Sequence, residues 1–188
     1  MTSIILIPKQ LIMWLLPLLL SLTACQQTPD AANLTQTSTV PTMAEAMERS
    51  IAQGEYLVRL GGCNDCHTPG YPESAGKMPK SEWLQGSPVG HHGPWGTAYP
   101  TNLRLSIDKL SEQDWMIYSA NLRTRPLMPD FMLRDMSDAD RRDIYRFIKS
   151  LGPAGQSAPE GLPPGVKPSA PYLEMVLPPP DTGSAHTG

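Results

Sequence analysis

The segment Cys63-Asn64-Asp65-Cys66-His67 places two thiols three positions apart and an imidazole directly after the second thiol. This C-x-x-C-H spacing is the pattern of covalent c-type haem attachment. Thioether bonds would join the two thiols to the vinyl groups of one haem, and His67 would bind the iron. The motif therefore predicts a chain that folds around a large, covalently held apolar cofactor.

Three other interpretations of the two cysteines remain: a redox-active dithiol, half of a zinc site, or a buried structural pair. A zinc site would need a second pair of ligands, and the only other cysteine is Cys25. A thioredoxin-like dithiol would need a strand–helix–strand pattern, which the sequence does not show. Haem attachment is the favoured interpretation.

The residues around the motif resemble class I bacterial cytochromes c. Gly54 to Gly62 precede the motif and Thr68-Pro69-Gly70 follows it, while Arg125-Pro126-Leu127-Met128-Pro129-Asp130-Phe131 resembles the Met-Pro-x-Phe loop that supplies the second axial ligand in that family. The resemblance covers about residues 44–152. It implies an all-α domain with the small cytochrome c fold, in which the N- and C-terminal helices cross and a further helix precedes the methionine loop.

Met128 is the predicted sixth ligand of the iron, opposite His67. It lies 61 residues after His67 (128 − 67), and Pro126 and Pro129 restrict the backbone on both sides of it. A thioether is a soft, neutral donor that favours reduced iron. A methionine can also simply fill space in a core. The alternative ligands are Met132, Met136, His91, His92 and His186.

The segment Gly93 to Leu103 resembles the stretch that lines the haem edge in cytochrome subunits of periplasmic dehydrogenases. The resemblance implies that Trp95, Tyr99 and Asn102 form hydrogen bonds to a buried haem propionate. The alternative is that Trp95 and Tyr99 are core aromatics.

Apolar periodicity and capping residues predict helices over about 44–60, 111–123 and 137–151. The resemblance to class I cytochromes c implies that Gly54 lets the last of these helices cross the first closely, in contact with Tyr145 or Phe147. A break near Gly54 is the alternative. Residues 68–110 are rich in glycine and proline, which is typical of loops. No strand pattern is present, which also predicts an all-α class.

Residues 1–24 are predicted to be an export signal, since they contain one charged residue, Lys9, and an apolar run too short to span a membrane stably. The signal ends in Leu22-Thr23-Ala24-Cys25, which resembles the lipobox of bacterial lipoproteins and implies that Cys25 is acylated and anchored. A cleaved soluble signal is the alternative. Gln26 favours the outer over the inner membrane of a Gram-negative bacterium.

Composition limits the folded part to one small domain. The chain has 188 residues with 21 prolines and 6% aromatic residues, which indicates extended segments. Residues 25–43 form a predicted tether, residues 44–152 the haem domain, and residues 153–188 a proline-rich tail in which Pro171-Tyr172-Leu173 could dock. All three cysteines are assigned to lipid or haem, so no disulfide is predicted.

These observations together predict a periplasm-facing, lipid-anchored electron carrier with one haem c, which is not an enzyme. Its partners would be redox proteins, such as a dehydrogenase, an oxidase or another cytochrome. A net charge of −3 argues against nucleic-acid binding. Alternatives are a subunit of a dehydrogenase or oxidase complex, a haem peroxidase and a gas-binding sensor. The arginines expected to bind propionates or to steer an acidic partner are Arg104, Arg123, Arg125 and Arg134.

Overall fold

The computed structural model describes residues 40–178. The predicted signal peptide, Cys25, most of the predicted tether and His186 therefore lie outside the described residues. The described helices are α1 (Met43–Leu60), α2 (Cys63–His67), α3 (Leu103–Asp108), α4 (Glu112–Asn121), α5 (Asp130–Asp135) and α6 (Asp138–Leu151), with a short 3-10 helix, η4 (Lys80–Glu82). None of these described helices has the length and apolar character needed to cross a membrane.

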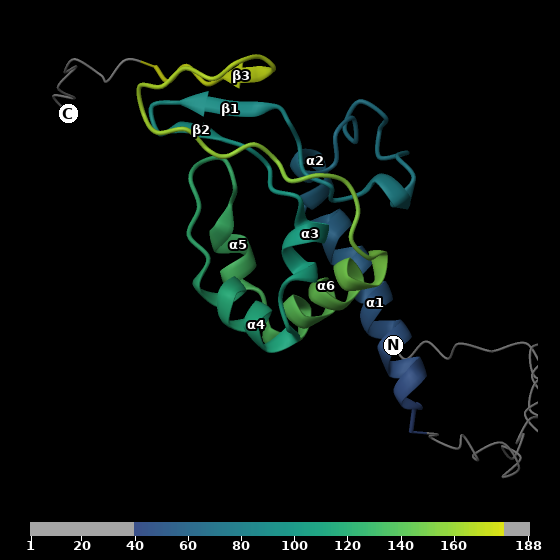
Figure 1. Cartoon of the computed structure of the whole chain (residues 1–188). Coiled ribbons are helices and arrows are strands. Elements are labelled where there is room, and N and C mark those ends of the chain that lie inside the picture. The colour runs from purple at the N-terminus through teal and green to yellow at the C-terminus, as the bar shows by residue number, and fades with distance from the viewer. Residues whose placement is uncertain (1–39, 179–188) are drawn as a thin grey trace, which may run out of the picture. The chain divides into compact units, whose positions relative to one another are not determined.

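Three short strands accompany the helices: β1 (Gly90–Gly93), β2 (Gly96–Ala98) and β3 (Tyr172–Glu174). They form one sheet in the order β2-β1-β3, with β1 antiparallel to β2 and parallel to β3 (Figure 1). The predicted all-α class with a small cytochrome c fold is therefore wrong, because the domain combines helices with a mixed sheet. The strands are only three or four residues long, with the sequences Gly-His-His-Gly, Gly-Thr-Ala and Tyr-Leu-Glu, and so lack the alternating apolar pattern by which strands are recognised.

Helix α1 is continuous and crosses α6 at Gly54. It begins at a capping box in which Thr42 and Glu45 bind each other's backbone N–H groups, so the ends of the helix are well defined. A Cβ atom on Gly54 would overlap the backbone oxygen of Asp143 and lie 2.7 Å from Cβ of Phe147. The predicted close crossing is confirmed, Phe147 makes the contact, and the alternative of a break at Gly54 is wrong.

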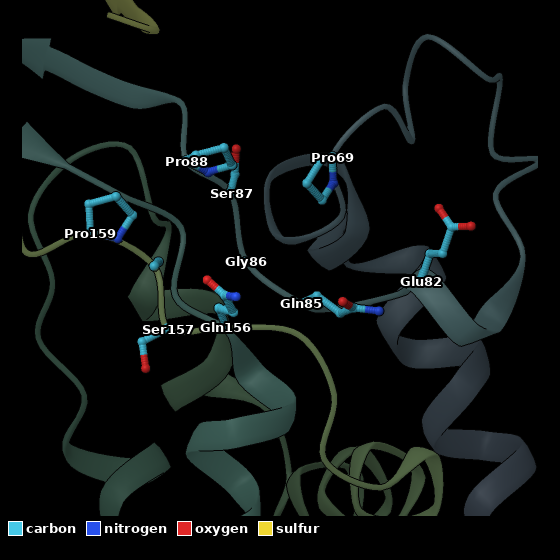
Figure 2. A pocket seen from close by; sticks show the side chains of 10 residues that line it. Pro69, Glu82, Gln85, Gly86, Ser87, Pro88, Gln156, Ser157 and Pro159 are labelled. Carbon is cyan, nitrogen blue, oxygen red and sulfur yellow. The ribbon is translucent and has the colours of Figure 1, made fainter. Parts of the chain in front are cut away.

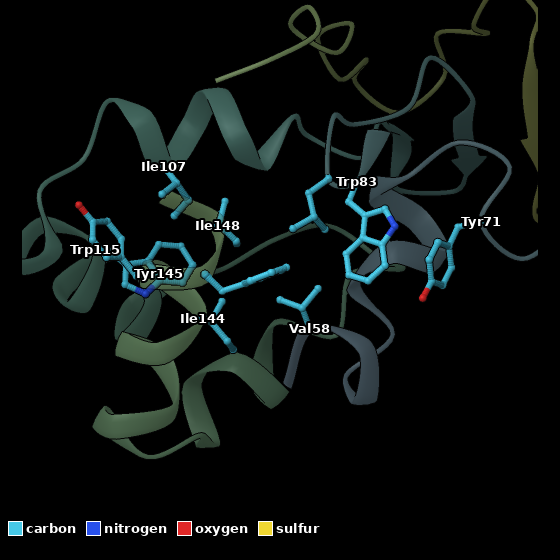
Figure 3. Close-up of a cluster of buried hydrophobic side chains, with 10 residues drawn as sticks. Val58, Tyr71, Trp83, Ile107, Trp115, Ile144, Tyr145 and Ile148 are labelled. Carbon is cyan, nitrogen blue, oxygen red and sulfur yellow. The ribbon is translucent and has the colours of Figure 1, made fainter. Parts of the chain in front are cut away.

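The core lies between α1, α6, α3 and α4 and continues into the loop after α2 (Figure 3). Trp83 joins the two parts, since its ring meets Phe147 edge-on at 6.2 Å and Tyr71 at 5.7 Å between centroids. The buried apolar residues are Val58, Tyr71, Trp83, Leu84, Ile107, Trp115, Ile144, Tyr145, Phe147 and Ile148. The apolar stripe of α6 thus supplies a large share of this core, as its sequence predicted.

Polar side chains fix the ends of the helices. Ser111 and Asp114 form the predicted capping box of α4, and Ser137 caps α6. At the other end of α6, the buried Arg104 donates hydrogen bonds to the backbone oxygens of Leu151 and Gly152. Arg104 therefore satisfies carbonyls that a helix end leaves without partners.

The segment after α6 packs back on the domain more extensively than predicted. Docking of Pro171 to Leu173 is confirmed, because β3 pairs with β1 and Gly90 N donates to Pro171 O at 3.1 Å. Leu162 also forms a bridge with Thr97. Residues 152–175, which we call the docked tail, are consequently part of the folded unit.

Candidate haem-attachment site

The C-x-x-C-H motif forms the short helix α2, entered through Gly62 in the left-handed conformation (φ +65°). Residues three and four positions apart share one face of a helix. Cys63, Cys66 and His67 therefore project from the same side of α2. Cys66 is exposed and Cys63 is half-buried, and both are free thiols.

Both thiols are held in the protonated form. Burial raises the pKa of Cys63 to about 11. Burial also raises the pKa of Cys66, and the neighbouring Asp65 carboxylate adds to that effect. Redox-active dithiols depend on a lowered cysteine pKa. The pKa shifts at this site thus count against the dithiol alternative.

His67 is buried and is oriented by the backbone of Thr101. Its Nδ1 lies 2.7 Å from the Thr101 oxygen. Because a carbonyl oxygen can only accept a hydrogen bond, Nδ1 carries the proton and Nε2 keeps its lone pair. Nε2 makes no hydrogen bond among the described residues. Burial lowers the His67 pKa, which the bond to Thr101 partly opposes. The result is a neutral imidazole with Nε2 available for a metal.

A buried polar pair next to the motif was not anticipated from the sequence. The Thr68 hydroxyl donates to Oδ1 of Asn64 at 2.7 Å and accepts from Leu84 N at 2.8 Å. Gly86 N donates to His67 O at 2.8 Å. These bonds fix α2 against the loop after it. The i, i+4 spacing of Asn64 and Thr68 was the one available signal, but nothing in the sequence marked the pair as buried.

The three predicted propionate contacts differ in what they can offer. Trp95 has a buried Nε1–H with no partner among residues 40–178, and its ring packs against Gly93. Asn102 uses both amide hydrogens, donating to the oxygens of Ala154 and Gln156 at 2.9 Å and 3.0 Å. Asn102 also caps α3, so it has no hydrogen left for a propionate. These bonds do not support the predicted propionate contact of Asn102.

Tyr99 lies with its ring against Gly90, where a Cβ atom would be 3.0 Å from the nearest ring carbon. No hydrogen bond of its hydroxyl occurs within the described residues, so the phenolic O–H remains available. Tyr99 therefore stays a candidate contact beside Trp95.

Met128 lies in the segment between α4 and α5, residues 123–129, which we call the methionine loop. Its side chain is 39% exposed. Three apolar neighbours are also exposed: Leu127, Phe131 and Met132. Met136, by contrast, packs against the core, so the core-filling role considered for any methionine applies to Met136.

The proximal histidine and the methionine loop approach the same stretch of chain. His67 binds the oxygen of Thr101, and Arg125 of the methionine loop donates to the oxygen of Thr97 at 3.3 Å. Residues 97–101 therefore lie between the two predicted ligand segments. The two predicted ligand segments, in which His67 and Met128 are 61 residues apart in sequence, are thus both hydrogen-bonded to the same short stretch of backbone.

His91 and His92 lie on β1 and not in an open loop. Nδ1 of His92 is 2.9 Å from the Thr97 hydroxyl, and its ring packs edge-on against Tyr172. Burial lowers the pKa of His91, which is half-buried in the sheet. His92 is thus engaged in holding the strands together.

Most of the four arginines that were predicted to bind propionates or steer a partner form hydrogen bonds to backbone oxygens. Arg104 donates to Ser81 O at 2.7 Å as well as to the end of α6. Arg134 pairs with Asp130 at 2.5 Å, and Arg125 is bound as described above. Arg104 is buried, and its Nε, Nη1 and Nη2 atoms each donate to a backbone oxygen, which does not support its predicted role in binding a propionate or steering a partner.

A cavity of about 500 Å³ lies elsewhere, between the loop after η4 and the docked tail (Figure 2). Its lining residues are Pro69, Glu82, Gln85, Gly86, Ser87, Pro88, Gln156, Ser157, Ala158 and Pro159. Cys63, Cys66, His67 and Met128 do not line this cavity. The cavity therefore borders the motif at Pro69 and Gly86 but contains none of the proposed haem ligands.

The described residues contain no group of three or more His, Cys, Asp or Glu side chains arranged to hold a metal ion. A structural zinc site would need such a group. Comparison of the chain with protein-family models, curated proteins and solved structures found no match. The motif and the geometry around it are therefore the features that point to a function.

Proposed function

We propose that this chain is a single-electron carrier with one covalently bound haem c. Cys63 and Cys66 would form the thioether bonds, and His67 and Met128 would bind the iron. The observation that carries the proposal is the placement of both thiols and a neutral imidazole on one face of α2, with Nε2 of His67 free.

The surroundings fit such a group. Trp95 offers a buried N–H donor that lacks a partner among the described residues, which suits an anionic propionate. The exposed side chains of Leu127, Met128 and Phe131 form an apolar group that a flat apolar cofactor would cover. These residues and α2 come from segments joined through residues 97–101.

The residues of the chain would hold and tune the cofactor. Haem, when bound, supplies the reversible one-electron change. Thr101 fixes the ring of His67 and the position of its proton. Met128 contributes a soft, neutral sulfur, which favours the reduced state. In this proposal the protein is an electron carrier and not an enzyme, since the redox change occurs at the haem and no substrate bond is made or broken.

The proposed partners are redox proteins, such as a dehydrogenase, an oxidase or another cytochrome, and not nucleic acid. The proposed location is the periplasmic side of a membrane, with acylated Cys25 as the anchor and the outer membrane favoured by Gln26. The predicted signal and anchor lie outside the described residues, so this part of the proposal depends on the sequence alone.

A denaturing gel stained for haem tests the proposal. Thioether bonds survive unfolding, so wild-type protein is expected to keep haem on the gel. The Cys63→Ala, Cys66→Ala double variant is expected to lose it. Cys25→Ser removes a thiol elsewhere and, in exported protein, should retain haem. Covalent haem in the double variant, or none in wild type, would refute the proposed function.

A further inference from the structure

The docked tail runs along β2 and reaches the methionine loop. Thr97 and Leu162 exchange two backbone hydrogen bonds, of 2.9 Å and 3.0 Å. Gly96 permits this approach, since its φ is +95° and a Cβ atom there would overlap the backbone oxygen of Leu162. The tail is therefore held closely against β2 at this point.

Arg125 joins this point to the methionine loop. Its Nη1 lies 2.6 Å from the oxygen of Leu162 and 3.3 Å from that of Thr97. Hydrogen bonds from a charged donor are stronger than neutral ones. A single guanidinium thus contacts both the tail and β2, three residues before Met128.

The methionine loop is otherwise closed on itself. Thr124 N donates to Oδ2 of Asp130 at 2.6 Å, and the Thr124 hydroxyl donates to Met128 O at 3.2 Å. Among the described residues, the loop's side-chain hydrogen bonds to segments outside residues 122–135 all come from Arg125. The loop is therefore a small unit that Arg125 fastens to the domain.

We propose that Arg125 is a positioning residue for Met128, and that the docked tail helps to hold Met128 in place through the Leu162 carbonyl. The inference rests on the proposed function, because it concerns the hold of Met128 on the iron. Without this contact the loop would open more often. An external ligand competing for the sixth position would then bind with a higher apparent affinity, since its affinity scales with the population of the open state.

The test measures imidazole binding to the oxidised iron of the full-length, haem-loaded protein. Binding is monitored by loss of the far-red charge-transfer band between iron and sulfur. Arg125→Ala is expected to lower the apparent Kd for imidazole about tenfold, the order of effect of losing one charge-assisted hydrogen bond. Arg123→Ala is the matched control. Its guanidinium donates only to the adjacent Leu122 oxygen among the described residues, so its Kd should change less than about twofold.

Of two further measurements, the first does not use the iron band and the second does not remove the charge. Backbone hydrogen exchange should become faster in residues 123–130 of Arg125→Ala. Gly96→Ala displaces the tail instead of the guanidinium, and it should also lower the Kd for imidazole. Because both variants break one contact, combining them should add little to the larger single effect.

The outcomes separate this inference from the proposed function. If Arg125→Ala leaves both the Kd and the exchange unchanged, or if Arg123→Ala changes them equally, the positioning role is refuted and the carrier function stands. Haem-loaded wild type without the far-red band would refute Met128 as the ligand and, with it, this inference. Wild type without covalent haem would overturn the proposed function as well.

Discussion

Met128 and Met132 are the two exposed methionines in and next to the methionine loop, at 39% and 42% exposure. Both side chains are available to a cofactor, so exposure alone does not separate them. Position does: Met128 lies in the loop that Thr124 and Arg125 fix, whereas Met132 lies within α5. A loop restrained in this way is better suited to hold a weak thioether ligand on the iron.

Met128→Leu is therefore expected to abolish the far-red iron–sulfur band of the oxidised protein and to let the reduced protein bind carbon monoxide, since leucine has no donor atom. Met132→Leu, the matched control, should keep the band and bind carbon monoxide poorly. Optical spectra of both variants decide the point. A band that persists in Met128→Leu would identify another methionine as the ligand. Its absence from wild type would favour a histidine ligand or the open site of a peroxidase or gas sensor.

Single residues were predictable from the sequence where local chemistry determines their role. The motif residues Cys63, Cys66 and His67 come together because one helical turn brings them together. Asn102 and Arg104 were misjudged because their partners are backbone oxygens about fifty residues later in the chain. No local sequence pattern predicts such distant partners. The sequence alone does not distinguish a buried polar side chain that is hydrogen-bonded to the backbone from one that binds a ligand.

At the level of elements, the crossing of α1 and α6 fixes the frame from which α2 projects. The two helices are in backbone contact at Gly54, so the space for a side chain is absent there. Alanine is the better helix former by about 1 kcal/mol, but an overlap with backbone atoms forces the helices apart. The clash should outweigh the gain in helix propensity.

Gly54→Ala is expected to lower the free energy of unfolding of the haem-loaded protein by about 3 kcal/mol, the upper range for overpacking a tight contact. Guanidinium unfolding followed by far-ultraviolet circular dichroism measures this change. Gln53→Ala, at the adjacent exposed position of α1, should alter stability by less than about 0.5 kcal/mol. Equal stability of Gly54→Ala and wild type would show that the helices do not cross at this residue.

The longer helices were predictable because apolar periodicity and capping residues agree over many positions, as in α6 with Ser137 before it and Gly152 after it. The strands were not. β1 consists of Gly-His-His-Gly and is defined by its pairing with β2 and with a strand about eighty residues later. Long-range backbone pairing between short polar segments leaves no periodic trace in the sequence.

At the scale of the whole molecule, the proposed attachment to a membrane depends on Cys25. Acyl chains would anchor the protein without a spanning segment. Cys25→Ser is therefore expected to block processing at the lipobox and to shift the protein out of its normal membrane fraction. Mass spectrometry of the mature N-terminus and cell fractionation measure these outcomes. A wild-type N-terminus that carries no lipid would contradict the anchor.

The parallel pairing of β1 with β3 has a kinetic consequence. His91 lies opposite Leu173, so the sheet closes only after residues 91–173 are all available or, for a chain exported as proposed, have all crossed the membrane. The contact of Gly54 with Asp143 likewise spans most of the domain. A topology dominated by such distant pairings folds slowly. The newly exported chain would therefore present Cys63 and Cys66 in an open state for some time, which is the interval in which covalent attachment is sterically easiest.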